Sequence, residues 1–153
     1  MPEDTTTTTT TQPMYYMDYE DRLIDEVETI ARNYPIFADI NSVNSSISVA
    51  TLPASTTIRK YYDGIVDKEY VSELTVKAKA SERELATKEL AAIGAELAEL
   101  SDIPSSNGSY DFGGITVTNE LFFLEATTDG WIYFKLQIKS LLTVYKEQTN
   151  GEK

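Results

Sequence analysis

The chain has 153 residues, a length that suits one domain with short tails. It contains neither cysteine nor histidine, which excludes disulfide bonds, thiolate chemistry, the common hydrolase triads and most zinc sites. With 25 acidic and 13 basic residues the net charge is −12, which disfavours sequence-specific binding to nucleic acid because the phosphates are repelled. A pore through which nucleic acid slides without adsorbing remains compatible with this charge.

The first 14 residues are dominated by a threonine run, residues 5–11. Such a segment cannot bury enough apolar surface to offset the entropy of ordering, so residues 1–14 are predicted to be a disordered tail. The opening Met-Pro-Glu-Asp is not the basic region of a signal peptide, and no apolar run reaches the roughly 20 residues of a membrane helix. We therefore expect synthesis in the cytoplasm and no membrane partner.

A first helix is predicted over residues 16–33, because apolar residues recur at helical spacing and Tyr34-Pro35 enforces extended backbone after them. Its expected buried stripe contains Leu23, Ile24, Val27, Ile30 and Ala31. Acidic residues fall mainly outside this stripe, and the chain has no D-x-D-x-D-G pattern of a Ca²⁺ loop. The candidate acidic face of the helix contains Asp18, Asp21, Asp25 and Glu28.

Two strands are predicted before a tight turn. Residues 46–51 alternate apolar with small polar side chains, as a strand with one buried face does. Residues 58–62 form the second strand, and Asp63-Gly64 then supplies the positive φ angles that a hairpin turn requires. We interpret Asp63-Gly64 as this turn rather than as a ligand-binding loop.

A third strand, residues 69–79, alternates between two faces. The face expected to enter the core contains Tyr70, Ser72, Leu74, Val76 and Ala78. Glu69 and Glu73 lie on the opposite face and are a conceivable glycosidase-like carboxylate pair. Nothing else in the sequence indicates a sugar cleft, so we do not favour a catalytic role for them.

Residues 81–100 predict a second helix. Ser81 is expected to cap the free amides while Glu84 bonds back to the first turn, as in a capping box. Gly94 lies inside the helix at a cost of about 1 kcal/mol relative to alanine, and close packing on the sheet is its simplest explanation. The expected buried stripe contains Leu85, Ala86, Leu90, Ile93, Leu97 and Leu100.

Two further strands complete the predicted sheet. Residues 115–123 form one, and residues 131–145 alternate apolar and polar side chains well beyond the usual strand of roughly 5–6 residues. A strand of this length is expected to project past its own domain and pair with a neighbour. Trp131, Tyr133 and Tyr145 lie on its polar face, where they belong either to a protein interface or to a second packed layer.

The predicted order is α-β-β-β-α-β-β, one α+β domain over residues 15–146 with a mostly antiparallel sheet and two helices packed on it. A flexible tail is predicted at residues 147–153. A basic pair next to two tyrosines before the hairpin turn looks like a nucleic-acid-binding patch. Because the chain is so acidic, we favour instead an edge strand whose charges prevent pairing with other chains, or a protein contact. These candidate interface residues are Arg59, Lys60, Tyr61 and Tyr62.

The order of elements, together with the Tyr61-Tyr62-Asp63-Gly64 turn, resembles the tail terminator and minor capsid proteins of long-tailed, siphovirus-type bacteriophages. In that family an early acidic helix precedes a short strand. A Y-x-D-G-like turn then leads into a strand that ends near a lysine and into a helix with Leu and Ile stripes, and a late aromatic strand follows. The corresponding segments here are residues 24–30, 47–49, 61–64, 70–79, 85–100 and 131–142. The resemblance covers roughly residues 16–146, and the threonine-rich start departs from it.

The resemblance implies a structural virion protein rather than an enzyme, with no cofactor. It implies a ring, usually a homohexamer, that is assembled in the host cytoplasm and caps the finished tail tube at the head–tail interface. Its partners would be other copies of the chain, the major tail tube protein and a head-completion or stopper protein. DNA would only pass through, and an acidic lumen would let it do so without adsorbing.

Two other functions remain open on the sequence alone. One keeps the chain in the virion as a head–tail connector, a stopper or a minor capsid adaptor. The other, from a different class, is a small acidic protein-binding module of a cell. Neither requires a catalytic, cofactor-binding or metal-binding residue, and the sequence indicates none.

Overall fold

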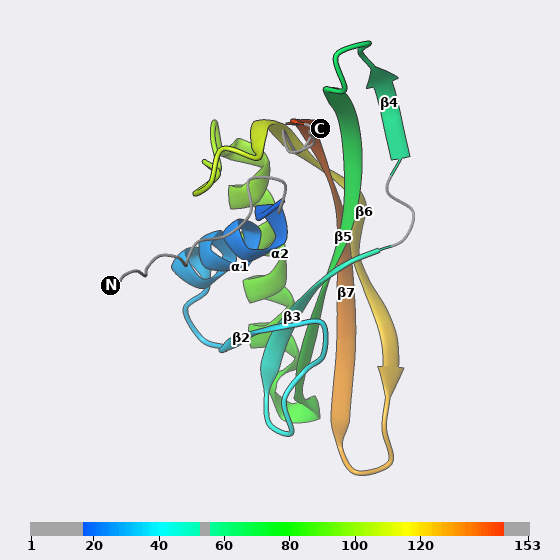
Figure 1. The fold of residues 1–153 in the computed structure, drawn as a ribbon. Helices are drawn as coiled ribbons and strands as arrows, with labels where there is room; N and C mark the ends of the chain where they lie inside the picture. Colours follow the sequence, from blue (N-terminus) through cyan, green and yellow to red (C-terminus); the bar gives the residue numbers. More distant parts are fainter. Residues whose placement is uncertain (1–16, 53–55, 146–153) are drawn as a thin grey trace, which may run out of the picture.

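The computed structural model describes residues 17–52 and 56–145. The predicted disordered and flexible tails, residues 1–14 and 147–153, lie outside the described residues, and those assignments stay predictions. Figure 1 shows the sheet nearly edge-on, with both helices on one side of it and no helix on the other. The predicted α+β class is confirmed.

The described residues form two α-helices and six strands. The helices are α1 (Tyr19–Ile30) and α2 (Arg83–Glu99). The strands are β2 (Ile36–Ala38), β3 (Ser46–Thr51), β4 (Thr56–Lys60), β5 (Val66–Lys79), β6 (Tyr110–Ala126) and β7 (Trp131–Val144).

All six strands belong to one sheet, in the order β2-β3-β5-β7-β6, and β4 pairs with the same edge of β5 as β3 does. Every pair is antiparallel except β2 with β3, which is parallel. β2 is the one strand that the sequence did not predict. Its three residues are too few to show an alternation, and only pairing with β3 makes the segment a strand.

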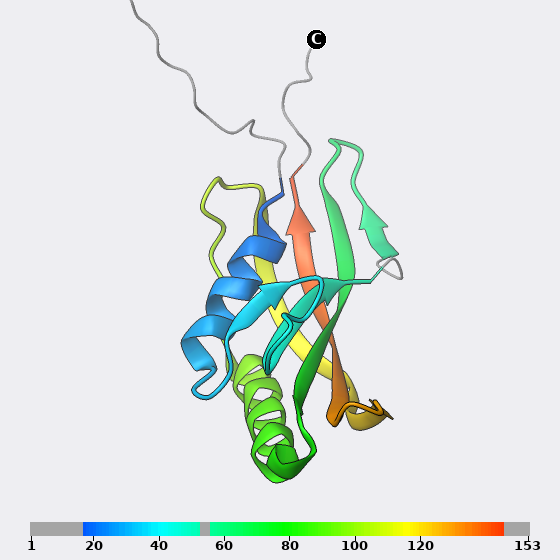
Figure 2. The same cartoon turned by 90° about the horizontal axis from the view of Figure 1, so that it is seen from below.

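The predicted hairpin turn is confirmed between β4 and β5, but its loop spans residues 61–65 and only Gly64 of the Asp63-Gly64 pair has a positive φ. Gly64 adopts φ 94°, and its amide donates to the Tyr61 carbonyl over 3.0 Å. The predicted strand over residues 58–62 is shifted, because β4 ends at Lys60 and both tyrosines belong to the turn. The hairpin extends beyond the rest of the sheet in both ribbon views (Figures 1 and 2).

The prediction that the last strand projects past the domain is wrong. β7 lies inside the sheet and pairs with β5 from Trp131 to Val144, while β6 pairs with its other side. Its length is matched by β5, which also has 14 residues, and by β6, which has 17. On this side of the sheet the edge strand is therefore β6 and not β7.

Helix α2 packs its apolar stripe on the sheet, with Ala86, Leu90, Ile93 and Leu97 buried as predicted, whereas Leu85 is exposed. The predicted capping box is wrong. The chain leaves β5 through a short 3₁₀ turn, η2 (Ala80–Glu82), whose first amide donates to the Gly130 carbonyl over 3.1 Å. Ser81 therefore lies within that turn, and Glu82 is the N-cap, with no side-chain cap hydrogen bond.

Gly94 lies where α2 packs tightly against β7. A Cβ built on it would lie 2.9 Å from Cδ2 of Leu136 on β7, closer than carbon atoms normally approach. Since Leu136 is itself buried, the predicted explanation of this glycine, close packing of the helix on the sheet, is confirmed.

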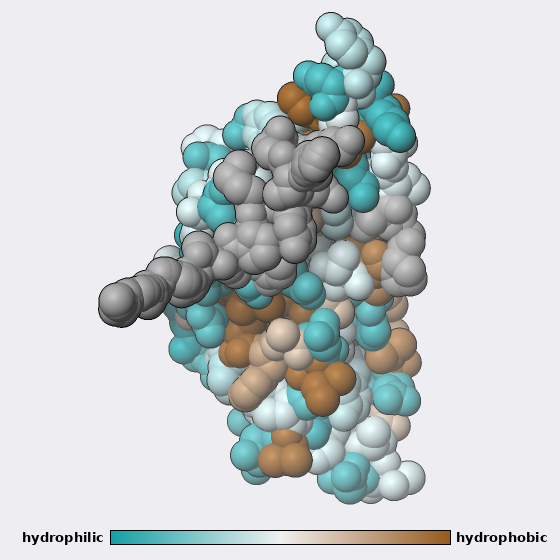
Figure 3. All heavy atoms as spheres, in the orientation of Figure 1, coloured by the Kyte–Doolittle hydropathy of each residue, from teal (hydrophilic) through white to brown (hydrophobic). Residues whose placement is uncertain are grey.

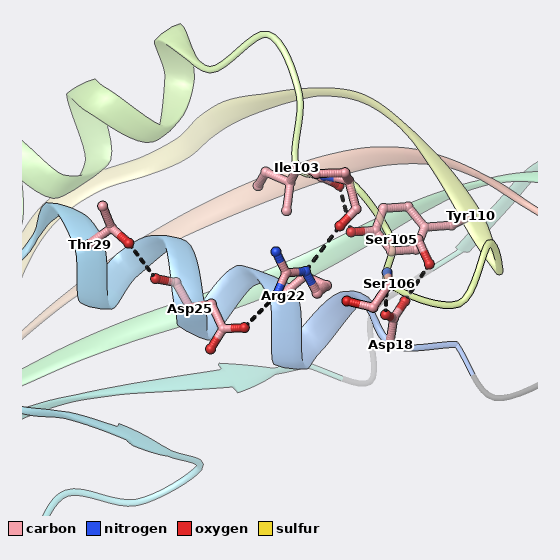
Figure 4. A network of polar contacts seen from close by, with 9 residues as sticks. Asp18, Arg22, Asp25, Thr29, Ile103, Ser105, Ser106 and Tyr110 are labelled. Atoms are coloured by element: carbon pink, nitrogen blue, oxygen red, sulfur yellow. Dashed lines mark hydrogen bonds and ion pairs between the residues drawn. The ribbon is translucent and has the colours of Figure 1, made fainter. Parts of the chain in front are cut away.

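Asp18 joins the start of α1 to the loop between α2 and β6 (Figure 4). Its carboxylate accepts hydrogen bonds from the Ser105 hydroxyl at 2.7 Å, the Ser106 amide at 2.8 Å and the Ser109 hydroxyl at 3.1 Å. Nearby, Arg22 donates to the Pro104 carbonyl over 3.0 Å. Asp18 is consequently only 5% exposed and is no part of an exposed acidic face, contrary to the prediction.

A second buried carboxylate fixes the other end of α1. Glu89 of α2 accepts hydrogen bonds from the backbone amides of Arg32 at 2.7 Å and Asn33 at 2.8 Å, and from the Asn33 side chain at 2.9 Å. Glu89 thus satisfies two backbone amides just after α1, while Asp18 satisfies one backbone amide and two hydroxyls of the loop before β6.

Replacing Asp18 by alanine is expected to lower the free energy of unfolding by about 2–3 kcal/mol, because three donors of the serine loop, the buried Ser109 among them, lose their acceptor. Chemical denaturation of Asp18→Ala against the unmodified chain measures this loss. The matched control is Glu28→Ala, an exposed acid of the same helix, which is expected to change stability by less than about 0.5 kcal/mol. Equal effects of the two variants would contradict the anchoring role.

Candidate functional site

One face of the sheet carries no helix (Figure 1). The residues of β5 and β7 on that face are mainly polar. We call this face of the sheet the open face. Strand register sets its composition, because every second residue of each strand points away from the helices. Its residues on the two central strands are Asp67, Glu69, Val71, Glu73, Thr75 and Lys77 of β5 and Trp131, Tyr133, Lys135, Gln137, Lys139, Leu141 and Thr143 of β7.

The centre of the open face is a ladder of cross-strand polar contacts. Lys135 Nζ lies 2.6 Å from Glu73 Oε1, and Gln137 Nε2 donates to Glu73 Oε2 over 2.9 Å. Asn119 of β6 extends the ladder by donating to the Gln137 side chain over 2.6 Å. Burial raises the pKa of Glu73, but the hydrogen bonds from Lys135 and Gln137 and the lysine charge together bring that pKa below its ordinary value of 4.5.

The second carboxylate of the conceivable catalytic pair is engaged in the same way. Glu69 Oε1 lies 3.5 Å from Nζ of Lys139. A glycosidase needs one carboxyl whose pKa is raised so that it can donate a proton, and Glu73 has the opposite shift. The geometry of the two glutamates is that of cross-strand ion pairs between neighbouring strands.

At the hairpin end, the open face holds a hollow of about 300 Å³ between β4 and β6. Apolar side chains of Ile58 and Leu141, both exposed, contribute to its lining together with Gly113. Charged residues contribute as well, namely Arg59, Asp67 and Asp111. Asp67 is held in place by the hydroxyls of Thr143 at 2.8 Å and Tyr61 at 3.0 Å.

The four candidate interface residues before the hairpin turn lie together at the end of the molecule. Arg59, Lys60 and Tyr62 are exposed, and the side chain of Tyr62 is fully exposed. Tyr61 is 39% exposed and bonds to Asp67 rather than projecting freely. The structure thus brings these residues together as a basic and aromatic hairpin.

The structure separates the three aromatic candidates of the last strand. Trp131 and Tyr133 lie at the end of β7 paired with Lys79 and Lys77, and the Lys77 ammonium lies 4.5 Å from the centre of the Trp131 ring. Tyr145 follows the opposite end of the strand, where its hydroxyl donates to Asp111. The three side chains are partly buried, and they form no single aromatic patch.

A further hollow, about 360 Å³, lies on the open face near Tyr133 and was not predicted. The loop after β2 borders it, held by Lys77 Nζ donating to the carbonyls of Ser42 at 3.0 Å and Val43 at 3.1 Å. This loop exposes Ile40 and Val43, at 75% and 82%. Isolated apolar residues in a polar loop show no periodic signal, so the sequence could not indicate them. On the face drawn in Figure 3, apolar residues form small groups separated by hydrophilic ones.

The remaining acidic candidates lie on α1, on the helical side of the sheet. Asp21, Asp25 and Glu28 are exposed, at the spacing that places them on one side of a helix. Asp25 forms an ion pair with Arg22, with 2.6 Å between Nη1 and Oδ2. Three of the four predicted acids therefore form an exposed acidic face, which is separate from the basic and aromatic hairpin.

Two further kinds of site concern residues 17–52 and 56–145, a metal site and a membrane-spanning helix. Within those ranges no group of three or more Asp, Glu, His or Cys side chains is arranged to hold a metal ion. No helix in the same ranges is long and apolar enough to cross a membrane.

Comparison with known proteins bears on the fold alone. No family model matches the sequence, and no curated protein matches it. A solved structure of a protein whose name indicates no function is similar, with a TM-score of 0.50 and 16% sequence identity over 84% of this chain and 93% of that one. At this identity the likeness shows a shared fold over most of both chains.

Because the pKa of Glu73 is lowered by folding, its ion pair is expected to stabilise the protein above the ordinary glutamate pKa of 4.5 and to lose this effect as the pH falls through the folded value. The Glu73→Gln variant should be about 1–3 kcal/mol less stable at neutral pH, and the difference should shrink in acid. Urea denaturation at neutral and acidic pH tests this, with Glu69→Gln, whose longer ion pair is more exposed, as the control. A difference for Glu73→Gln that does not change with pH would contradict the assignment.

Proposed function

We propose that this chain is a structural virion protein, a tail terminator subunit of a long-tailed bacteriophage. Several copies form a ring that caps the tail tube and joins it to the head-completion complex. The proposal starts from the family resemblance of the YYDG turn, the strand after it and the helix that follows, residues 61–100.

The observation that carries the proposal is a sheet with a strand edge left unpaired on each side. Among the described residues, no strand pairs with the outer side of β6 or of β4. The unpaired backbone amides and carbonyls of such an edge can pair with a strand of another chain. A subunit that works by joining other subunits needs edges of this kind.

Charge supports the same function. The net charge of −12 and the exposed acids Asp21, Asp25 and Glu28 give the domain a surface that repels phosphate. We infer that this acidic face of α1 borders the lumen, where DNA passes without adsorbing. The basic and aromatic hairpin is then available for contacts with protein.

Removing the protein from an infection is expected to leave tubes that grow past their normal length and heads without tails, because nothing caps the growing end. Electron microscopy of lysates from a phage lacking the gene measures both effects. A head-completion adaptor would instead leave tails of normal length that fail to join heads. Complementation with the unmodified gene is the control, and normal virions without the protein would contradict both structural functions.

The fully exposed Tyr62 is expected to contact a virion partner. Tyr62→Ser should weaken binding to purified tail tubes or to the head-completion protein by about tenfold or more, without changing the melting temperature. Leu85→Ser, an exposed apolar residue of α2, is the matched control and should bind normally. Undiminished binding of Tyr62→Ser to both partners would remove the hairpin tip from the interface.

A further inference from the structure

Three strand edges are open in the described part of the chain, and their charges differ. β6 contains Asp111, Glu120 and Glu125 and no basic residue. β4 contains Arg59 and Lys60 and no acidic residue, and all five of its residues are exposed. β2 is three residues long, carries no charge and is followed by Asp39.

These charges favour one pairing over the others. Two copies joined through β6 would bring acidic strands together, and two copies joined through β4 would bring basic strands together. Like charges across paired strands are destabilising, whereas opposite charges are stabilising. The complementary partner for β6 is therefore the β4 strand of another copy.

Strand direction permits this pairing in its more stable form. β5 is antiparallel to β4 and to β7, and β7 is antiparallel to β6, so β4 and β6 run in opposite directions. A second copy placed beside the first in the same orientation continues the sheet with β4 antiparallel to β6. Antiparallel pairs are slightly more stable per residue than parallel pairs.

The register identifies the residues that would meet. Arg59 pairs with Asp67, Asp67 with Thr143, and Thr143 with Asp111, so the four residues form one row across β4, β5, β7 and β6. Directly paired residues point to the same face, which here is the open face. A neighbouring copy at the same level places its Arg59 beside Asp111.

We propose that copies of this chain associate head to tail, with β4 of one copy pairing with β6 of the next and Arg59 facing Asp111 across the junction. This inference rests on the proposed function, because a ring of identical subunits requires a head-to-tail interface that repeats around an axis. The next row that points to the open face places Thr56 opposite Gly114, which has no side chain to obstruct the approach of the strand.

Charge reversal tests this interface in the full chain by sedimentation velocity at high protein concentration. Arg59→Glu and Asp111→Lys should each weaken self-association by about tenfold or more, since each creates a like-charge pair. An equal mixture of the two variants should associate again, because every junction in an alternating assembly then joins opposite charges. The double variant Arg59→Glu/Asp111→Lys should also associate, and Lys88→Glu on exposed α2 should behave as the unmodified chain does.

This interface would be overturned if both single variants self-associated as strongly as the unmodified chain does. It would also be overturned if the mixture stayed dissociated while each variant kept the circular dichroism spectrum of the folded chain. An unmodified chain that remains monomeric at the highest concentration would overturn it as well. None of these outcomes removes the proposed function, which depends on whether the protein caps tail tubes. Failure to bind tubes while the charge-reversal pattern holds would instead overturn the function and leave the interface standing.

Discussion

The pairing of β5 with β7 is the constraint on which the rest of this molecule depends. The two strands pair continuously from Val66 with Val144 to Lys79 with Trp131, and this register decides which side chains enter the core. A slip by one residue would exchange the buried apolar set for the polar set on both strands at once. The helices lie on one face because that face alone is apolar, and the ion-paired ladder occupies the other.

The same register places ion-paired charges at the centre of the sheet and charges of a single sign on each of the edge strands β4 and β6. On the open face Glu73 and Glu69 each have a lysine partner on β7, so the centre of the sheet needs no external counterion. At its edges the charges have no such balance, since β6 is acidic and β4 is basic. Balanced charge in the middle and complementary charge at the two edges suit a subunit that is stable alone and specific in its association.

The sequence predictions failed where a residue's neighbours come from distant parts of the chain. Asp18 belongs by spacing to the exposed acids of α1, but the loop before β6 covers it and uses it as an acceptor. Ser81 has the sequence of a cap, but contact of Ala80 with Gly130 starts a 3₁₀ turn first. The long last strand was predicted to project past the domain and pair with a neighbour, but β7 is paired on both sides inside the sheet.

The sequence by itself determined the α+β class, the two helices, the hairpin turn at Asp63-Gly64 and the alternation of β5 and β7. These features follow from local periodicity and from the φ angles that glycine permits, which need no knowledge of distant residues. It also indicated the hairpin as a candidate interface. Only the tertiary structure decided strand order, the parallel β2, the burial of Asp18 and the row that joins Arg59 to Asp111. Those depend on which distant strands hydrogen-bond and in which register, and no local pattern encodes that choice.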